Sequence, residues 1–112
     1  MRVELLYSDA DPTYMETRQR LVEVLTEDAF ETPIQMIAVR SAEDAELLGF
    51  RGSPTIRIDG VDIDPLAADA PVGLGLRRYD GDEPREPSSG VPSRRLSRAA
   101  IDRARGWSHG AR

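Results

Sequence analysis

The sequence contains neither cysteine nor lysine. Without cysteine, the chain has no disulfide, no thiolate nucleophile and no soft sulfur ligand for a metal. Without lysine, it has no amine for Schiff-base catalysis, and all 15 basic residues are arginine. Its single histidine, His109, lies in the C-terminal tail, where nothing in the sequence indicates that it is anchored for a catalytic triad or a metal site. These absences exclude thiol–disulfide exchange and lysine catalysis.

Aromatic residues and long hydrophobic runs are also scarce. The 112 residues include one Trp, two Phe and three Tyr, so a core has to be built mostly from Leu, Ile and Val, in a chain long enough for one domain. No apolar run approaches the roughly 20 residues that a membrane-spanning helix needs. No apolar signal region precedes the first expected strand. The sequence therefore predicts a cytoplasmic protein with no membrane association.

Charge is distributed unevenly along the chain, whose net charge is −5. Residues 1–83 carry 8 Arg against 18 Asp and Glu, whereas residues 84–112 carry 7 Arg against 2 acidic residues. A basic tail can bind nucleic acid, but seven spread arginines are more typical of a solvated helix face that pairs with an acidic body. Nucleic acid is therefore not expected as a partner.

The middle of the chain predicts a β-hairpin. Residues 55–58 and 61–63 alternate apolar and polar side chains, as half-buried strands do. Asp59-Gly60 between them favours a type I′ turn, which needs a positive φ at both central positions. Pro54 precedes the first strand, where it costs no ladder hydrogen bond and can adopt a cis peptide bond.

Residues 3–7 and 34–39 are largely apolar and predict two further strands. The second is apolar on both alternating faces, which is typical of a central strand covered by helices on both sides. Between them, Asp11 as N-cap and Pro12 as first helical residue predict a helix that ends between residues 28 and 32. The two strands should be parallel and joined by a right-handed crossover.

Two more helices are expected. Ser41 and Asp44 form a pair like a capping box at the start of a short helix, which Gly49 or Gly52 can end. The last helix should follow residues 91–93 and reach about residue 105, because small and aliphatic residues recur there at helical spacing.

The remaining segments predict little regular structure. Residues 64–90 are rich in Asp, Pro and Gly and read as an irregular loop insertion, with one added strand over residues 74–79 and disorder over 81–90. Gly106 is expected to stop the last helix, and residues 107–112 to form a flexible tail.

Three short motifs occur in an order that resembles a known superfamily. They are Tyr7-Ser8-Asp9-Ala10-Asp11-Pro12-Thr13-Tyr14, Gly52-Ser53-Pro54-Thr55-Ile56-Arg57-Ile58-Asp59-Gly60 and Gly90-Val91-Pro92. The chain resembles the thioredoxin and glutaredoxin superfamily, and within it small bacterial thioredoxin-like proteins, some of them selenoproteins and some alkylmercury-lyase-like. The resemblance covers about residues 2–105. It implies an α/β, thioredoxin-like three-layer fold (βαβ-α-ββα) over residues 1–106, with a central mixed sheet of four strands and a cis-proline loop facing the first helix.

The motifs depart from that superfamily where its chemistry resides. Asp11 stands where the nucleophilic cysteine or selenocysteine would be, and Tyr14 stands where a second cysteine would be. A helix N-terminus activates a thiolate by lowering its pKa, whereas a carboxylate there is merely stabilised as an anion. The resemblance therefore implies the fold and its cleft, but neither disulfide exchange nor mercury lyase chemistry.

The candidate binding cleft combines two of the motifs. Asp11 alone is explained as a helix cap, but together with Asp9 it also offers two carboxylates for acid–base work or a hard cation, with no third acidic ligand nearby. We therefore predict no metal, no cofactor and no catalytic residue. The resemblance implies that the backbone of Ser53 pairs with a peptide or thiol substrate by strand addition. The predicted cleft residues are Ser8, Asp9, Asp11, Pro12, Tyr14, Ser53, Pro54 and Thr55.

Three functions fit these observations. The first is a redox-inactive thioredoxin-fold protein that binds a peptide, a small molecule or a partner protein at the cleft. The second is a small transferase-type enzyme that handles glutathione, with Ser8 or Tyr7 assisting an external thiol. The third is a homodimeric assembly module that pairs through an exposed sheet edge, for which the strand containing Ile56 is the candidate.

Overall fold

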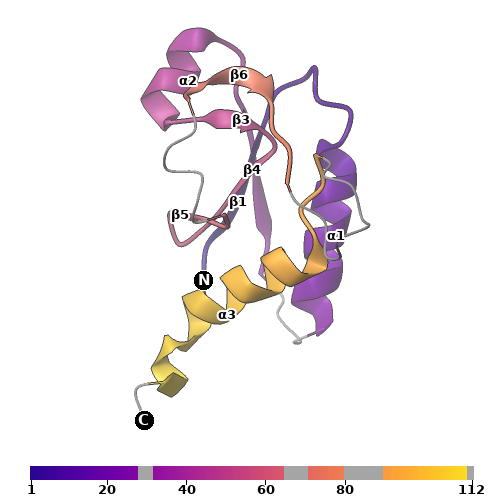
Figure 1. The fold of residues 1–112 in the computed structure, drawn as a ribbon, viewed down its shortest axis with the longest axis vertical. Coiled ribbons are helices and arrows are strands. Elements are labelled where there is room, and N and C mark those ends of the chain that lie inside the picture. Colours follow the sequence, from indigo (N-terminus) through magenta and orange to yellow (C-terminus); the bar gives the residue numbers. More distant parts are fainter. Residues whose placement is uncertain (28–31, 65–70, 80–89, 111–112) are drawn as a thin grey trace.

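The computed structural model describes residues 1–27, 32–64, 71–79 and 90–110 (Figure 1). These residues form a mixed α/β fold with three helices around a four-stranded sheet. The predicted disorder over residues 81–90 falls almost entirely outside the described residues. In chain order the elements are β1 (Val3–Tyr7), α1 (Tyr14–Glu27), β2 (Ile34–Ala38), α2 (Ala42–Leu48), β3 (Arg51–Ser53), β4 (Thr55–Ile58), β5 (Val61–Asp62), β6 (Gly73–Leu76) and α3 (Arg94–Gly110).

The main sheet has the strand order β2-β1-β4-β5. β1 is parallel to β2 and antiparallel to β4, and β4 is antiparallel to β5. The predicted mixed sheet of four strands is therefore confirmed. β3 and β6 form a separate parallel pair. The added strand predicted over residues 74–79 is present as β6, which covers Gly73–Leu76, whereas β3 was not predicted.

The hairpin formed by β4 and β5 has the predicted geometry. Asp59 and Gly60 have φ angles of 53° and 82°, so both central turn positions are left-handed, as a type I′ turn requires. The Ser53–Pro54 peptide bond immediately before β4 is cis.

The prediction that residues 34–39 form a central strand is wrong. β2 lies at an edge of the main sheet and pairs, within the described residues, only with β1. Its side chains are apolar on both faces because Met36 packs into one hydrophobic cluster and Ile37 into another on the opposite face. Apolar side chains on both faces of a strand thus indicate that other layers cover both faces. They do not indicate whether the strand pairs with one neighbouring strand or with two. Ile56 belongs to β4, inside the sheet, and is 0% exposed, so a homodimer formed by edge pairing of this sheet would use β2 or β5 and not the strand that contains Ile56.

The helices cover both faces of the sheet and make three layers. On one face, Leu5 and Ile56 of the sheet pack with Leu21 of α1 and Ile101 of α3. On the other face, Leu6 packs under the short helix α2 in a smaller hydrophobic cluster. Its buried members are Leu6, Val39, Ala45 and Phe50.

Helix α1 begins two residues later than predicted. Its first helical hydrogen bond is donated by Thr17 N to Thr13 O over 3.0 Å, which makes Thr13 the residue before the first full turn. The Asp11 carboxylate instead accepts from Thr13 N and closes a turn ahead of the helix, a local bond that aspartate commonly makes. By contrast, the prediction for α2 is confirmed, because Ser41 Oγ accepts from Asp44 N and Gly49 ends the helix with φ of 62°.

Helix α3 begins at the predicted place and ends later than predicted. Ser93 Oγ accepts a hydrogen bond from Leu96 N over 3.0 Å and caps the helix. The helix then continues through Gly106 to Gly110, so the predicted stop at Gly106 is wrong. One glycine inside a helix costs only about 1 kcal/mol relative to alanine, which neighbouring turns can offset.

No helix among the described residues is long and apolar enough to span a membrane.

Two arginines of α3 pair with the acidic face of α1. Arg94 forms ion pairs with Glu23 and Glu27, and Arg98 forms one with Glu27. This confirms for these residues the expectation that the basic C-terminal region pairs with the acidic body. Such half-exposed pairs contribute little stability individually, about 0–1 kcal/mol each.

Candidate functional site

Three segments meet at one end of the main sheet. Tyr7 at the end of β1 pairs with Ala38 at the end of β2, and Leu6 pairs with Thr55 at the start of β4. The loop after β1, the loop after β2 and the cis-proline segment before β4 therefore lie together. In α/β folds, the carboxyl ends of parallel strands are where ligands commonly bind.

The carboxylate of Asp11 joins the loop after β1 to the cis-proline segment. It is buried at 2% exposure, and its Oδ1 accepts hydrogen bonds of 2.7 Å from both Thr13 N and Thr13 Oγ1. Its Oδ2 accepts from Ser53 Oγ over 2.6 Å, and that same hydroxyl accepts from Ser8 N over 3.0 Å. We call Ser8, Asp11, Thr13 and Ser53 the Asp11 cluster. Gly90 packs against it so closely that a Cβ would lie 2.6 Å from Thr13 Oγ1.

These bonds leave Asp11 little capacity for chemistry. Both carboxylate oxygens already accept from donors within the chain, so action as a base or a metal ligand would require breaking those bonds. Asp9 lies in different surroundings, with its side chain 71% exposed, and the two carboxylates do not form a shared acid–base site. Within the described ranges, no three His, Cys, Asp or Glu side chains gather as a metal site would require.

A hollow of about 330 Å³ opens beside the Asp11 cluster. We call it the β1–α1 pocket. Ser8 lines it, and Ser8 Oγ is, among the residues that the structure describes, the one buried side-chain nitrogen or oxygen without a hydrogen-bond partner. Buried hydroxyls are nearly always hydrogen-bonded, to protein or to ordered water, so the partner of this one comes from outside the chain. The pocket is lined by Ser8, Asp9, Ala10, Val39, Arg40 and Leu74.

Opposite charges stand at the rim of this pocket. Arg40 Nε lies 3.9 Å from Asp9 Oδ2, and the two side chains are 72% and 71% exposed. A pair this long and this exposed is weak, because water screens it and both side chains remain free to move. The two groups are therefore available to a ligand at low cost.

The other predicted cleft residues have different surroundings. Pro12 is exposed. Tyr14 stacks on Tyr7 with ring centroids 4.2 Å apart and packs against the main hydrophobic cluster. Thr55 is buried, and its hydroxyl donates to Gly52 O and accepts from Arg77. None of these three residues lines the β1–α1 pocket.

The backbone of Ser53 already pairs with the chain itself. Its carbonyl oxygen accepts from Arg77 N over 2.8 Å, immediately after β6 in the small sheet formed with β3. The expectation that an added peptide strand pairs with Ser53 is wrong for this carbonyl, since β6 and the residue after it occupy that side.

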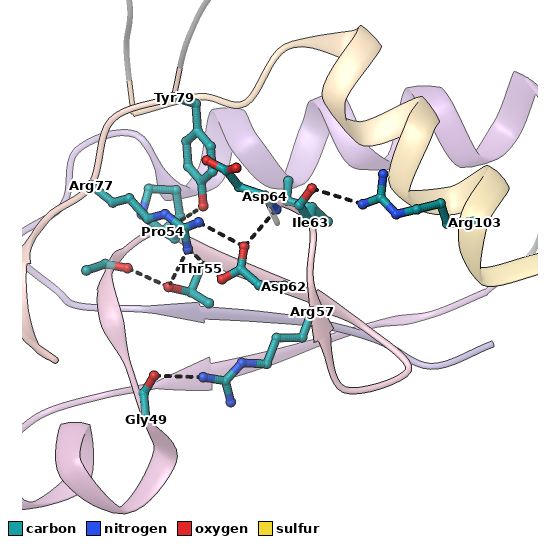
Figure 2. A network of polar contacts seen from close by, with 11 residues as sticks. Gly49, Pro54, Thr55, Arg57, Asp62, Ile63, Asp64, Arg77, Tyr79 and Arg103 are labelled. Carbon is teal, nitrogen blue, oxygen red and sulfur yellow. Dashed lines mark hydrogen bonds and ion pairs between the residues drawn. The ribbon is translucent and has the colours of Figure 1, made fainter. Parts of the chain in front are cut away.

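A polar network that is largely buried forms hydrogen bonds to the cis-proline segment (Figure 2). The Arg77 guanidinium makes two 2.8 Å hydrogen bonds to the Asp62 carboxylate and one of 3.3 Å to Thr55 Oγ1. It also stacks over the Tyr79 ring, 4.6 Å from its centroid. The Tyr79 hydroxyl in turn donates to Pro54 O over 2.6 Å. We call Asp62, Thr55, Arg77 and Tyr79 the Arg77 network.

The charge state of this network is well defined. Burial acts to lower the pKa of Arg77, but its hydrogen bonds to Asp62 and the surrounding negative charges outweigh burial and raise it. Burial also raises the pKa of Tyr79 far above its usual value, and the positive charge of Arg77 offsets only part of that rise. Arg77 is thus cationic and Tyr79 neutral under all ordinary conditions.

The raised pKa of Tyr79 predicts a loss of stability at alkaline pH. Tyr79 keeps its proton in the folded chain, whereas the unfolded chain releases it above about pH 10. The free energy of unfolding should therefore be unaffected by this group below pH 10 and fall above it by about 1.4 kcal/mol per pH unit. Urea denaturation between pH 8 and pH 11 measures this slope.

The matched variant for this measurement is Tyr79→Phe. At pH 8 it should be less stable by about 1–2 kcal/mol, because Pro54 O loses its donor. Its stability should then decline less steeply above pH 10, so that the two curves converge. Parallel curves for the two proteins would contradict the assignment of the alkaline transition to Tyr79.

Sequence reasoning missed several residues of this region. Arg40 could have been found, because it follows the strand parallel to β1 and the carboxyl ends of parallel strands meet. Leu74, Asp62 and Arg77 gave no local signal, since their contacts join segments that are distant in the sequence. Ser8, Asp11 and Ser53 were predicted as one cleft, and the structure brings them into direct contact.

Comparison with known proteins gave no further guide. No protein-family model matches this sequence, and no curated protein or solved structure is significantly similar to it.

Proposed function

We propose that this protein is a redox-inactive, thioredoxin-like binding protein whose ligand occupies the β1–α1 pocket. The observation that carries the proposal is the unpartnered hydroxyl of Ser8, buried at 6% exposure in the wall of the pocket. A buried hydroxyl without a partner costs about 1–3 kcal/mol. The ligand supplies the hydrogen bond that this hydroxyl does not find within the described part of the chain.

Three features support a thioredoxin-like fold. The strand order β2-β1-β4-β5 is mixed, with one parallel pair and two antiparallel pairs. α1 and α3 cover one face of the sheet and α2 covers the other. The cis peptide bond before Pro54 lies beside the start of α1, where Ser53 bonds to Asp11. The pair formed by β3 and β6 is an addition to that plan.

The enzymatic alternative has less support in the geometry. A glutathione-handling transferase needs a group that activates an external thiol. Ser8 Oγ is not hydrogen-bonded to any base in the described residues, and the nearby Asp11 carboxylate is occupied. The arrangement favours binding over catalysis.

A thermal-shift screen with small metabolites, glutathione and divalent metal ions tests the proposal. A ligand at a hundred times its Kd adds about 2.7 kcal/mol of stability, a rise in Tm on the order of 10 °C for a domain of this size. We expect at least one small metabolite to produce such a rise and metal ions to produce none.

The matched variant is Ser8→Ala. Ser8 Oγ makes no hydrogen bond in the described structure, so the variant should fold with a Tm equal to or slightly above that of the natural sequence. The ligand-induced rise should be reduced in this variant. A rise that is equal in both proteins would place the ligand elsewhere, and no rise with any compound would contradict the proposed function. A hit from glutathione alone, followed by turnover, would favour the transferase.

A further inference from the structure

The rim of the β1–α1 pocket carries both signs of charge, and this limits what can bind there. The shortest approach between Arg40 and Asp9 is made by Nε, at 3.9 Å, and no other hydrogen bond or ion pair engages either side chain in the part of the chain that the structure describes. The two terminal nitrogens of Arg40 can therefore take a carboxylate in the bidentate geometry that arginine favours. Asp9 can at the same time accept from an ammonium group.

The interior of the pocket adds a second constraint. Val39, Ala10 and Leu74 give it aliphatic walls, and Leu74 is 38% exposed, so a ligand can cover it. Ser8 also lines the pocket, and its buried hydroxyl, which has no hydrogen-bond partner among the described residues, can both donate and accept. The part of the ligand that lies inside the pocket should therefore combine aliphatic carbon with one hydrogen-bonding group.

Size excludes large ligands. A hollow of about 330 Å³ lies at the lower end of the roughly 300–1,000 Å³ that ligand pockets usually span. A nucleotide or a folded peptide would exceed it, whereas a molecule of about ten non-hydrogen atoms would fit.

We infer that the ligand is a free α-amino acid with a short side chain that ends in a hydroxyl or amide. This inference rests on the proposed function and names its ligand class. An α-amino acid carries its ammonium and carboxylate on one carbon, which matches adjacent opposite charges at the rim. Its carboxylate binds Arg40, its ammonium binds Asp9, and its side chain reaches Ser8 between the aliphatic walls.

The test is a titration of the ¹⁵N-labelled full chain, followed by amide chemical shifts. L-threonine is the probe, because it joins a methyl and a hydroxyl on one carbon. Its methyl ester lacks the negative charge, N-acetyl-L-threonine lacks the positive charge, and L-valine lacks the hydroxyl. We expect L-threonine to perturb the amides of residues 8–11, 39–40 and 74, and to bind at least tenfold more tightly than each of the three analogues.

Single substitutions show which side chain recognises the carboxylate, the ammonium and the hydroxyl of L-threonine. Arg40→Gln should weaken binding of L-threonine and of its N-acetyl form but not of its methyl ester, whereas Asp9→Asn should weaken binding of L-threonine and of its methyl ester but not of its N-acetyl form. Ser8→Ala should abolish the preference for L-threonine over L-valine. Asp102→Asn removes the same charge as Asp9→Asn from an exposed position on α3 and should leave all affinities unchanged.

The outcomes separate this inference from the proposed function. Equal binding of L-threonine and its two blocked forms would overturn the inference, because the rim charges would then play no part. Perturbation of the pocket amides by another metabolite of the thermal-shift screen, but by none of the amino acids tested, would overturn it while the proposed function stands. No perturbation of these amides by any compound would overturn both.

Discussion

Replacing Arg77 by alanine is expected to lower the free energy of unfolding by about 3 kcal/mol, in the range observed when one partner of a buried ion pair is removed. The Arg77 side chain is 7% exposed, and its loss would remove the two 2.8 Å bonds that it donates to the Asp62 carboxylate. It would also remove the cation over the Tyr79 ring and the donor to Thr55 Oγ1. Because Asp62 is 22% exposed, water should recover part of the loss.

Urea denaturation of four proteins measures this effect: the natural sequence, Arg77→Ala, Asp62→Ala and the double variant. The double variant should lose less stability than the sum of the two single variants, because each single change strands the remaining partner. Arg40→Ala is the matched control, since its ion pair is long and exposed and should be worth less than about 0.5 kcal/mol. Equal losses for Arg77→Ala and Arg40→Ala would contradict the role of the Arg77 network.

The second large effect is expected from Asp11→Ala, at about 3 kcal/mol. The change removes an acceptor from three donors, namely the amide and hydroxyl of Thr13 and the hydroxyl of Ser53. Hydrogen bonds to a charged group contribute about 1.5–3 kcal/mol each, and part of this is recovered where water reaches the freed donors. The link between the cis-proline segment and the start of α1 would be lost as well.

The variant Asp11→Asn removes the negative charge but keeps groups that can form the same hydrogen bonds, so it distinguishes the contribution of the charge from that of the bonds. Its amide oxygen can still accept from Thr13, and its amide nitrogen can donate to Ser53 Oγ if that hydroxyl turns. We therefore expect a loss of about 1–1.5 kcal/mol, smaller than for alanine because the bonds change in strength but remain. Thermal and urea denaturation measure both variants. A loss below about 0.5 kcal/mol for Asp11→Ala, the level of an ordinary exposed substitution, would show that the Asp11 cluster does not hold the site together.

Features with a local cause were predictable from the sequence. Asp59-Gly60 specified the turn of the β4–β5 hairpin, and Ser41 with Gly49 specified both ends of α2, because each acts within four residues of itself. Asp11 was located at the start of α1, but its own bond to Thr13 moved the first helical turn two residues along the chain.

Features that depend on distant partners were not predictable. The edge position of β2 follows from which strands pair across the sheet, and its apolar residues gave the same pattern that a central strand gives. Arg77 gave no sign of burial, because its partner Asp62 lies 15 residues away and an arginine in a polar segment is normally exposed. The bond between Asp11 and Ser53 spans 42 residues. Only the family resemblance placed these two segments together.

The exposure of Asp9 and Arg40 has an evolutionary consequence. Both side chains are more than two-thirds exposed, whereas the Asp11 cluster and the Arg77 network that support the pocket are largely buried. Substitutions at exposed positions usually change stability by no more than about 0.5 kcal/mol, whereas loss of a buried polar partner costs several times that. Descendants of this chain could therefore exchange the two rim residues, and with them the charge pattern of the pocket rim, without losing the fold. The part of the molecule that we propose selects a ligand is free to diverge, while the buried part that positions it is constrained.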